Sequence, residues 1–291
     1  MTTDVTITGI GCPIPSGTSA GPGVLVRYRN GDEAEICLQF DAGRSTVMRL
    51  TGAGCNLVDL DAVFLTHHHS DHCTGLQDLV LTRWVMDRKG GNDPLPIVCP
   101  EGPARTFVES MLTPWDDDLA VRKAHAERTD DPAIAVNAFP LPDYPGDPAE
   151  VFRVGDVVVK AGQVRHEPVH PAVGYRVETP DGVVAISGDT LVCDEVATLA
   201  SEADILVYEA LRFSVFDDLP RWRTFILDYH ADTKLIGTQA AELQTPHLVL
   251  THLIPPPATE ADEAEFVADV RAGGFTGELT VARDLTTITL G

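Results

Sequence analysis

The amino-acid sequence predicts an α/β fold in which two mixed β-sheets pack face to face and helices cover the outside. Short runs rich in β-branched residues recur in both halves of the 291-residue chain, and segments with helical spacing of apolar residues lie between them. Many short strands with interspersed helices are typical of layered sandwiches. No repeat or low-complexity tract interrupts the pattern, so we expect residues 1–291 to form a single domain.

The N-terminal half alternates strands with helices. Runs of β-branched residues with approximate apolar-polar alternation predict the strands Val5–Ile10, Gly23–Tyr28, Ala34–Phe40, Ala62–Leu65 and Leu95–Val98. Apolar residues at helical spacing predict a helix over Gly75–Asp87. Ser45–Ala53 and Glu101–Leu112 are the other helices that we expect in this half.

The C-terminal half repeats this alternation after an acidic, partly proline-rich stretch from Trp115 to Ala149. We expect that stretch to be an excursion from the fold, because strands resume at Val151. The strands expected beyond it are Val157–Val164, Val173–Glu178, Val183–Ile186, Ile205–Tyr208 and His247–Thr251, with Leu279–Thr289 as a closing strand or pair. The expected helices are Glu195–Ser201, Thr233–Leu243 and Glu260–Ala272.

Acidic residues outnumber basic ones by a wide margin. The 21 Lys and Arg residues stand against 44 Asp and Glu residues, which gives a formal net charge of −23. Because nucleic acids and anionic membranes attract basic surfaces, this charge argues against either as a partner. A multivalent cation would still allow an anionic substrate to bind. The hydrophobic content of 44% excludes a disordered acidic tail.

The six cysteines are scattered along the chain without a CxxC pair, which indicates reduced thiols rather than a disulfide scaffold. The N-terminus lacks the basic and apolar regions of a secretory signal. No apolar run approaches the ~18 residues of a membrane span. We therefore expect a soluble, cytoplasmic protein.

The segment with the strongest chemical signal joins a strand to a helix and has the pattern HxHxDH. Its residues are His67, His69, Asp71 and His72. Imidazoles two positions apart converge from one side of an extended segment, and imidazole with carboxylate is a typical zinc ligand set. A polar surface cluster or a tag-like run is the alternative, but a tag would not lie between a buried strand and an apolar helix. We therefore predict a metal site.

Four further motifs accompany this segment in chain order. They are Asp41-Ala-Gly43, Val164-Arg-His166, Ser187-Gly-Asp189-Thr190 and Leu250-Thr-His252-Leu253. Together the five motifs resemble the metallo-β-lactamase superfamily, and the resemblance extends from about residue 5 to the C-terminus. It implies an αββα sandwich with two metal ions. The implied ligands are His67, His69 and His166 for one ion, Asp71, His72 and His252 for the other, and Asp189 bridging both.

Two motifs narrow the resemblance to one branch of the superfamily. Tyr208-Glu-Ala210 and Tyr229-His230-Ala-Asp-Thr233 are similar to paired motifs of the RNase Z and arylsulfatase-like branch. The resemblance implies that His230 acts near the scissile group and that Glu209 orients it. A structural role is the alternative, in which His230 caps the helix that begins near Thr233.

Two departures argue against tRNA 3′-end cleavage, the activity of RNase Z. Members that process tRNA usually have a histidine where this chain has Tyr208. They also insert a long tRNA-binding arm between the residues that correspond to His166 and Asp189. Here two expected strands and a turn occupy that interval, which leaves no room for an arm.

Two features near the motifs allow more than one interpretation. His170 lies four residues after His166 and competes with it as a ligand, although the spacing to Gly174 favours His166. Five aromatic residues lie between Phe213 and Tyr229 and either pack in the core or line a hydrophobic substrate-binding lip. Arginines in the same segment either bind a phosphate or sulfate oxygen or are solvated.

The resemblance implies a dinuclear metal hydrolase that cleaves a small phosphodiester, phosphonate or sulfate ester with metal-activated water. Asp71 would orient the water, and His230 would assist departure of the leaving group. The expected cofactors are two divalent ions, zinc first, with manganese and iron as alternatives. Alternative functions are a lactonase or carboxylic esterase, RNase Z, and a non-catalytic metal-binding scaffold. The expected partner is a small-molecule ester; homodimers are common among relatives.

Overall fold

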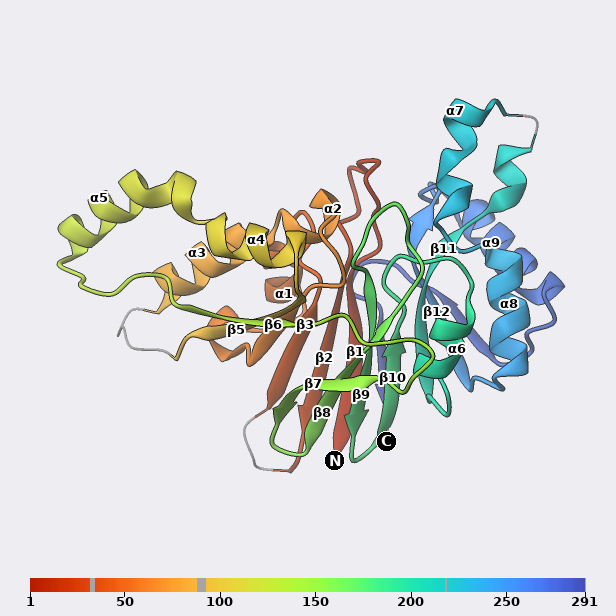
Figure 1. Cartoon of the computed structure of the whole chain (residues 1–291), viewed down its shortest axis with the longest axis horizontal. Coiled ribbons are helices and arrows are strands. Elements are labelled where there is room, and N and C mark those ends of the chain that lie inside the picture. The colour runs from red at the N-terminus through yellow and green to blue at the C-terminus, as the bar shows by residue number, and fades with distance from the viewer. Residues whose placement is uncertain (32–34, 88–92, 218, 291) are drawn as a thin grey trace.

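The computed structural model describes residues 1–31, 35–87, 93–217 and 219–290. Within these residues, two seven-stranded mixed sheets face each other and helices lie on the outer sides, so the predicted fold class is confirmed (Figure 1). β1 pairs antiparallel with β14, which brings the beginning and the end of the chain side by side. No helix in the described ranges combines the length and hydrophobicity needed to cross a bilayer.

The first sheet has the strand order β14-β1-β2-β3-β4-β5-β6. Its strands are β1 (Thr2–Gly9), β2 (Gly23–Arg29), β3 (Ile36–Phe40), β4 (Ala62–Phe64), β5 (Leu95–Pro100), β6 (Ile134–Phe139) and β14 (Thr287–Leu290). Pairing is antiparallel from β14 to β3 and parallel from β3 to β6. Ala34, where the strand prediction began, lies outside the described residues.

The second sheet repeats this arrangement with the order β13-β12-β11-β10-β9-β8-β7. Its strands are β7 (Ala149–Val154), β8 (Val157–Gln163), β9 (Val173–Thr179), β10 (Gly182–Ile186), β11 (Ile205–Leu211), β12 (His247–Ile254) and β13 (Glu278–Val281). β7 to β10 are antiparallel, and β10 to β13 are parallel. Parallel strands end at the same edge of a sheet, which gathers the loops that follow them.

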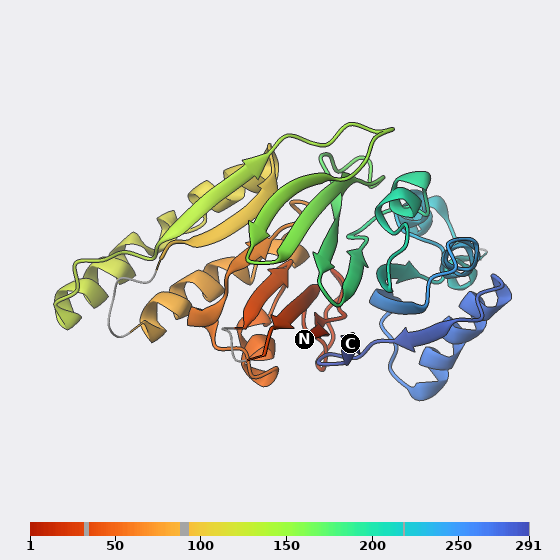
Figure 2. The same ribbon diagram turned by 90° about the horizontal axis from the view of Figure 1, so that it is seen from below.

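Helices cover the outer face of each sheet (Figure 2). On the first sheet these are α1 (Thr46–Gly52), α3 (Leu76–Met86) and α4 (Pro103–Ser110). On the second they are α6 (Asp194–Leu199), α8 (Thr233–Glu242) and α9 (Glu260–Ala272). The remaining helical segments are α2 (Ser70–Cys73), α5 (Asp116–Ala126), α7 (Arg221–Thr224), η1 (Leu57–Asp59), η2 (Thr113–Trp115), η3 (Phe213–Phe216) and η4 (Phe225–Asp228). α5 and α7 project from the body of the molecule (Figure 1).

The structure corrects the expectation for the stretch from Trp115 to Ala149. This stretch contains helix α5 and strand β6, and β6 pairs in parallel with β5 at the edge of the first sheet. An edge strand is buried on fewer sides than a central one, so its apolar pattern is weaker in the sequence. The closing segment is a pair, as one of the two alternatives stated, but β13 belongs to the second sheet and β14 to the first.

An aromatic cluster joins the two sheets beside the loops that carry the histidines. Phe40 of β3 and Phe64 of β4 stack with ring centroids 4.6 Å apart, and Tyr175 of β9 lies 5.4 Å from each. The fully buried Tyr175 hydroxyl donates a hydrogen bond to the carbonyl of Leu65 at 2.6 Å. This contact ties the second sheet to the backbone two residues before His67.

Candidate metal centre

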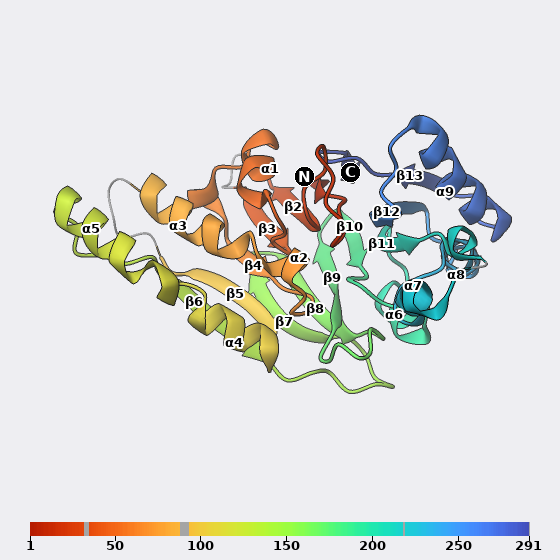
Figure 3. The same cartoon turned by 90° about the horizontal axis from the view of Figure 1, so that it is seen from above.

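The predicted site residues come from separate segments that meet at one end of the sandwich, where α2 lies (Figure 3). They are Asp41 after β3, His67 to His72 after β4, His166 after β8, Asp189 after β10, Glu209 in β11, His230 before α8 and His252 in β12. Each sheet thus contributes loops that follow its strands. All seven predicted ligands lie in this one region.

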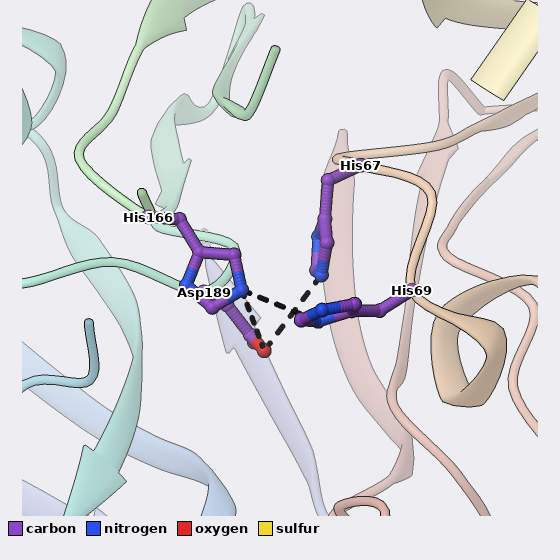
Figure 4. Close-up of side chains that lie close together, drawn as sticks. All are labelled: His67, His69, His166 and Asp189. Atoms are coloured by element: carbon purple, nitrogen blue, oxygen red, sulfur yellow. Dashed lines mark hydrogen bonds and ion pairs between the residues drawn. The ribbon is translucent and has the colours of Figure 1, made fainter. Parts of the chain in front are cut away.

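The first group consists of His67, His69, His166 and Asp189, whose candidate ligand atoms all lie within 4.8 Å of one another (Figure 4). Nε2 of His67 and Nε2 of His166 are each 3.9 Å from Oδ2 of Asp189. Nε2 of His166 also lies 3.3 Å from Nδ1 of His69. This is the grouping that the resemblance implies for the first ion.

The second group consists of Asp71, His72 and His252. Nε2 of His252 lies 3.4 Å from Oδ2 of Asp71, and Nε2 of His72 lies 3.7 Å from the same oxygen. Oδ2 of Asp189 is 3.3 Å from His72 Nε2 and 3.4 Å from His252 Nε2. One oxygen of Asp189 therefore faces histidines of both groups, which is the position expected of a bridging ligand.

The donor atoms of both groups fit divalent metal ions. Six of the seven predicted ligands are at most 2% exposed, and His69 is partly exposed. Among the Nε2 and carboxylate atoms of these ligands, the buried ones without a hydrogen-bond partner in the described part of the chain are His67 Nε2, Asp71 Oδ2, His72 Nε2 and His252 Nε2. Buried polar atoms are normally paired. Two ligand atoms on a tetrahedral zinc ion lie ~3.3 Å apart, close to the shorter spacings seen here.

The pKa shifts of the buried rings favour the neutral form for His67 and His166 and the protonated form for His72. Burial lowers the pKa of His67 well below its ordinary value and lowers that of His166 to about 4, so both rings are neutral near pH 7. For His72, burial also favours the neutral ring, but Asp189 and Asp41 outweigh it and raise the pKa. Neutral imidazoles beside buried carboxylates offer the lone pairs that a divalent cation requires.

Three of the histidines are oriented by a contact to their second ring nitrogen. Nδ1 of His72 lies 2.7 Å from Oδ2 of Asp41, and Nδ1 of His166 lies 2.9 Å from the Tyr229 carbonyl. Nδ1 of His67 lies 2.9 Å from Oγ1 of Thr66. Such contacts fix the ring orientation and leave Nε2 for a metal. Asp41, the first residue of the Asp41-Ala-Gly43 motif, thus orients His72.

An unusual backbone conformation orients the side chains of Asp41 and His252 toward the site. The sequence patterns did not predict this conformation. Asp41 and His252 adopt left-handed conformations, with φ of 54° and 45°. Pairing between β11 and β12 shifts at this point, because Glu209 faces Thr251 while Ala210 faces Leu253. His252 is therefore the extra residue of a β-bulge, which redirects its side chain out of the alternation of the strand. Strained backbone of this kind is concentrated at functional sites.

Glu209 and His230 form a buried pair at the edge of the two groups. Nδ1 of His230 lies 2.8 Å from Oε1 of Glu209, and the same oxygen accepts hydrogen bonds from the backbone N–H groups of Thr190 and Ala231. Burial lowers the pKa of His230, but the Glu209 carboxylate outweighs this effect and raises it to about 9. His230 lies near Asp189 and His252. Asp232, rather than His230, caps α8 by accepting from the Lys234 N–H.

The aromatic residues between Phe213 and Tyr229 differ in their surroundings. Phe213 and Phe216 pack against a small buried cluster with Leu211, whereas Trp222 is 74% exposed. Of the described aromatic residues of this segment, Tyr229 is the one that lies against the site, with its ring centroid 5.2 Å from His166 and 4.8 Å from His230.

The arginines of this segment and the competing histidine take no part in the two groups. Arg212 forms ion pairs with Asp269 and Glu265, and Arg221 pairs with Asp228. His170 is exposed and belongs to neither group. Between His166 and Asp189 the chain forms only a short loop and the strands β9 and β10, so no arm is inserted there.

Comparison with known proteins identifies the family. Residues 39–253 match the family described as the beta-lactamase superfamily domain. The chain therefore belongs to this superfamily and is a metal-dependent hydrolase that acts on ester bonds. The fold implies divalent metal ions, for which the two groups above supply candidate ligands.

Individual relatives place the chain in the RNase Z-like branch. It is 34% identical to Ribonuclease Z of Mycobacterium bovis over 97% of this chain and 96% of the relative. Among solved structures, it shares the fold of the metallo-β-lactamase fold protein YhfI from Bacillus subtilis, with a TM-score of 0.74, 21% identity and coverage of 99% and 100%. The short form of human tRNase Z has a TM-score of 0.68, 24% identity and 99% coverage of both chains.

Proposed function

We propose that the chain binds two divalent metal ions, zinc first, and hydrolyses a small phosphodiester, phosphonate or sulfate ester. The observation that carries this proposal is the position of Asp189 between the two groups, because one carboxylate oxygen faces His67 and His166 on one side and His72 and His252 on the other. Mixed nitrogen and oxygen ligands suit zinc, and manganese or iron remain alternatives.

We propose roles in hydrolysis for Asp71, His230 and Glu209. When bound, the two ions supply Lewis-acid polarisation of a substrate oxygen and lower the pKa of an attacking water. Asp71 orients that water through the carboxylate oxygen that lies 3.4 Å from His252. His230 stands beside the groups with Nδ1 held by Glu209, which leaves Nε2 free to assist the departing oxygen.

A small substrate is favoured over tRNA by charge and by shape. The formal net charge of −23 repels a polyanion, whose many phosphates require many basic contacts. The interval between His166 and Asp189 holds β9 and β10 without an arm. Arg212 and Arg221, two cations of the neighbouring segment, are engaged with acidic residues. We propose a small-molecule ester as the partner and the cytoplasm as the compartment.

Cleavage of tRNA precursors is the second candidate, because relatives named Ribonuclease Z match nearly the whole chain. The test is to load purified protein with Zn²⁺ or Mn²⁺ and to measure metal content. Turnover is then compared on bis(p-nitrophenyl) phosphate, a phosphonate ester, p-nitrophenyl sulfate, a lactone and a precursor tRNA. We expect two ions per chain and turnover of a small phosphorus or sulfur ester, with the precursor tRNA left intact.

Two variants make this test specific to the site. His67→Ala should abolish turnover, whereas His125→Ala, which changes an exposed histidine of α5, should retain it. Two bound metals without turnover on any ester would contradict the hydrolase proposal for these substrates. Efficient trimming of the precursor tRNA would instead favour the second candidate, and full activity of His67→Ala would refute the site assignment.

A further inference from the structure

One histidine of the second group lacks the outer contact that three others have. Nδ1 of His67, His72 and His166 each faces a polar atom of the protein within 2.9 Å. His252 is 1% exposed, and its Nδ1 has no hydrogen-bond partner among the described residues. When Nε2 of a histidine coordinates a metal, Nδ1 carries the proton and needs an acceptor. The geometry therefore requires an acceptor beside His252.

Glu209 has a carboxylate oxygen that lacks a hydrogen-bond donor. Its Oε1 faces three nitrogens, those of the His230 ring and of the Thr190 and Ala231 backbones. Its Oε2 is buried and has no partner within the described part of the chain, although the residue is only 1% exposed. A buried carboxylate oxygen without a donor is costly. An acceptor without a donor and a donor without an acceptor thus occur in adjacent strands, β11 and β12.

A small cavity is lined by both Glu209 and His252. It has a volume of about 30 Å³, and its lining includes Ser187, Val207 and Thr251 as well as Asp41, His72 and Asp189 of the candidate metal centre. A cavity must have a volume of at least ~10–15 Å³ and offer two to four polar partners to hold a water molecule. The cavity exceeds that size, and its walls include the two residues that carry the unpaired atoms and the hydroxyl-bearing residues Ser187 and Thr251.

We propose that this cavity binds one water molecule, which accepts a hydrogen bond from Nδ1–H of His252 and donates one to Oε2 of Glu209. Glu209 is then a positioning residue for two histidines at once, His230 by direct contact and His252 through the water. The inference rests on the metal-ligand role proposed for His252. Through the water, Glu209 would fix the orientation of His252 in the second group as well as that of His230.

The direct test is a high-resolution crystal structure of the metal-free protein. Electron density for a water within hydrogen-bond distance of His252 Nδ1 and Glu209 Oε2 supports the proposal. A cavity without such density, in a crystal that shows other buried waters, overturns it. This result does not depend on metal binding or turnover, so it is distinguishable from failure of the proposed function.

The functional test uses Glu209→Gln and chelator competition with Zn²⁺. The three nitrogens around Oε1 hold the amide oxygen at that position, so the amide NH₂ replaces the acceptor that faces the cavity. We expect one of the two ions to bind about tenfold or more weakly. Glu195→Gln is the matched control, because Glu195 is also a buried carboxylate, 5% exposed, but lies in α6 and pairs with Arg165. Equal affinities in the wild type and Glu209→Gln would overturn the proposal.

Two further variants separate the water from the direct contact to His230. In a His230→Ala background, Glu209→Gln should still weaken zinc binding by the same factor, since the route runs through His252; disappearance of the effect overturns the proposal. Val207→Ile adds a methyl group to the cavity wall and keeps the Glu209 charge. This variant should weaken the binding of the same ion. If a crystal structure shows the cavity filled by the new methyl group and the zinc affinity is unchanged, the proposed role of the water is contradicted. Fewer than two ions on the wild type would refute the proposed function instead.

Discussion

Nδ1 of His72 lies 2.7 Å from Oδ2 of Asp41, a residue 31 positions earlier in the chain. The other oxygen of Asp41 accepts a hydrogen bond from the Thr66 backbone N–H at 2.8 Å. One carboxylate at the end of β3 thereby fixes both the ring of a predicted ligand, His72, and the start of the loop that carries His67 and His69. This relationship connects the first sheet to both groups of the metal centre.

Asp41→Asn should weaken metal binding by about 10- to 100-fold while the protein remains folded. Asparagine tolerates the left-handed backbone of Asp41, whose φ is 54°, so the substitution removes the charge without adding strain. Calorimetric titration with Zn²⁺ measures the effect. Asp61→Asn is the control, because Asp61 accepts a hydrogen bond from the Cys37 N–H away from the site. Equal losses in both variants would show that the effect is not specific to His72.

His166→Ala should reduce the metal content to about one ion per chain, and His170→Ala should leave it at two. His166 is fully buried in the first group, whereas His170 is exposed and belongs to neither group. Metal analysis of the purified variants by mass spectrometry distinguishes the two histidines. A loss of metal in His170→Ala alone would reverse the assignment made from the spacing to Gly174.

His230→Ala should lower kcat by about 10²- to 10⁴-fold for esters with poor leaving groups, as expected when a proton donor is removed. The loss should be smaller for p-nitrophenyl esters, because their leaving group departs without protonation. Rates for a series of substituted phenyl esters measure this dependence. A loss that is the same across the series would indicate that His230 supports structure rather than the leaving group.

The ion pair between Arg128 and Asp130 should make a pH-dependent contribution to stability. The hydrogen bond from Arg128 lowers the pKa of Asp130 to about 2, below its ordinary value of 3.8. The stabilisation is therefore present above pH 3.8 and is lost as the pH falls toward 2. Since Asp130 is partly exposed, Asp130→Asn should cost about 1 kcal/mol or less at pH 7. Urea unfolding should show the two proteins converging between pH 4 and pH 2; a constant difference would contradict the assignment.

The fold class and most elements follow from local patterns. The central strands are short β-branched runs buried on both faces, such as β11 and β12, and these dominate the sequence signal. Strand β6 was missed because an edge strand with half-exposed residues lacks that signal. The sequence also did not predict that β13 and β14 belong to different sheets, because contacts between segments far apart in the chain determine which strands pair.

The sequence by itself determined which residues are candidates for the metal centre, because the spacing of His67, His69, Asp71 and His72 confines four donor atoms to one short segment that ends in α2. Only the tertiary structure decided how the other donors join them. The β-bulge at His252, the contact between Asp41 and His72 and the cavity beside Glu209 arise from pairing between strands far apart in the chain. Local spacing limits the reach of a loop, whereas the packing of two sheets fixes where loops meet.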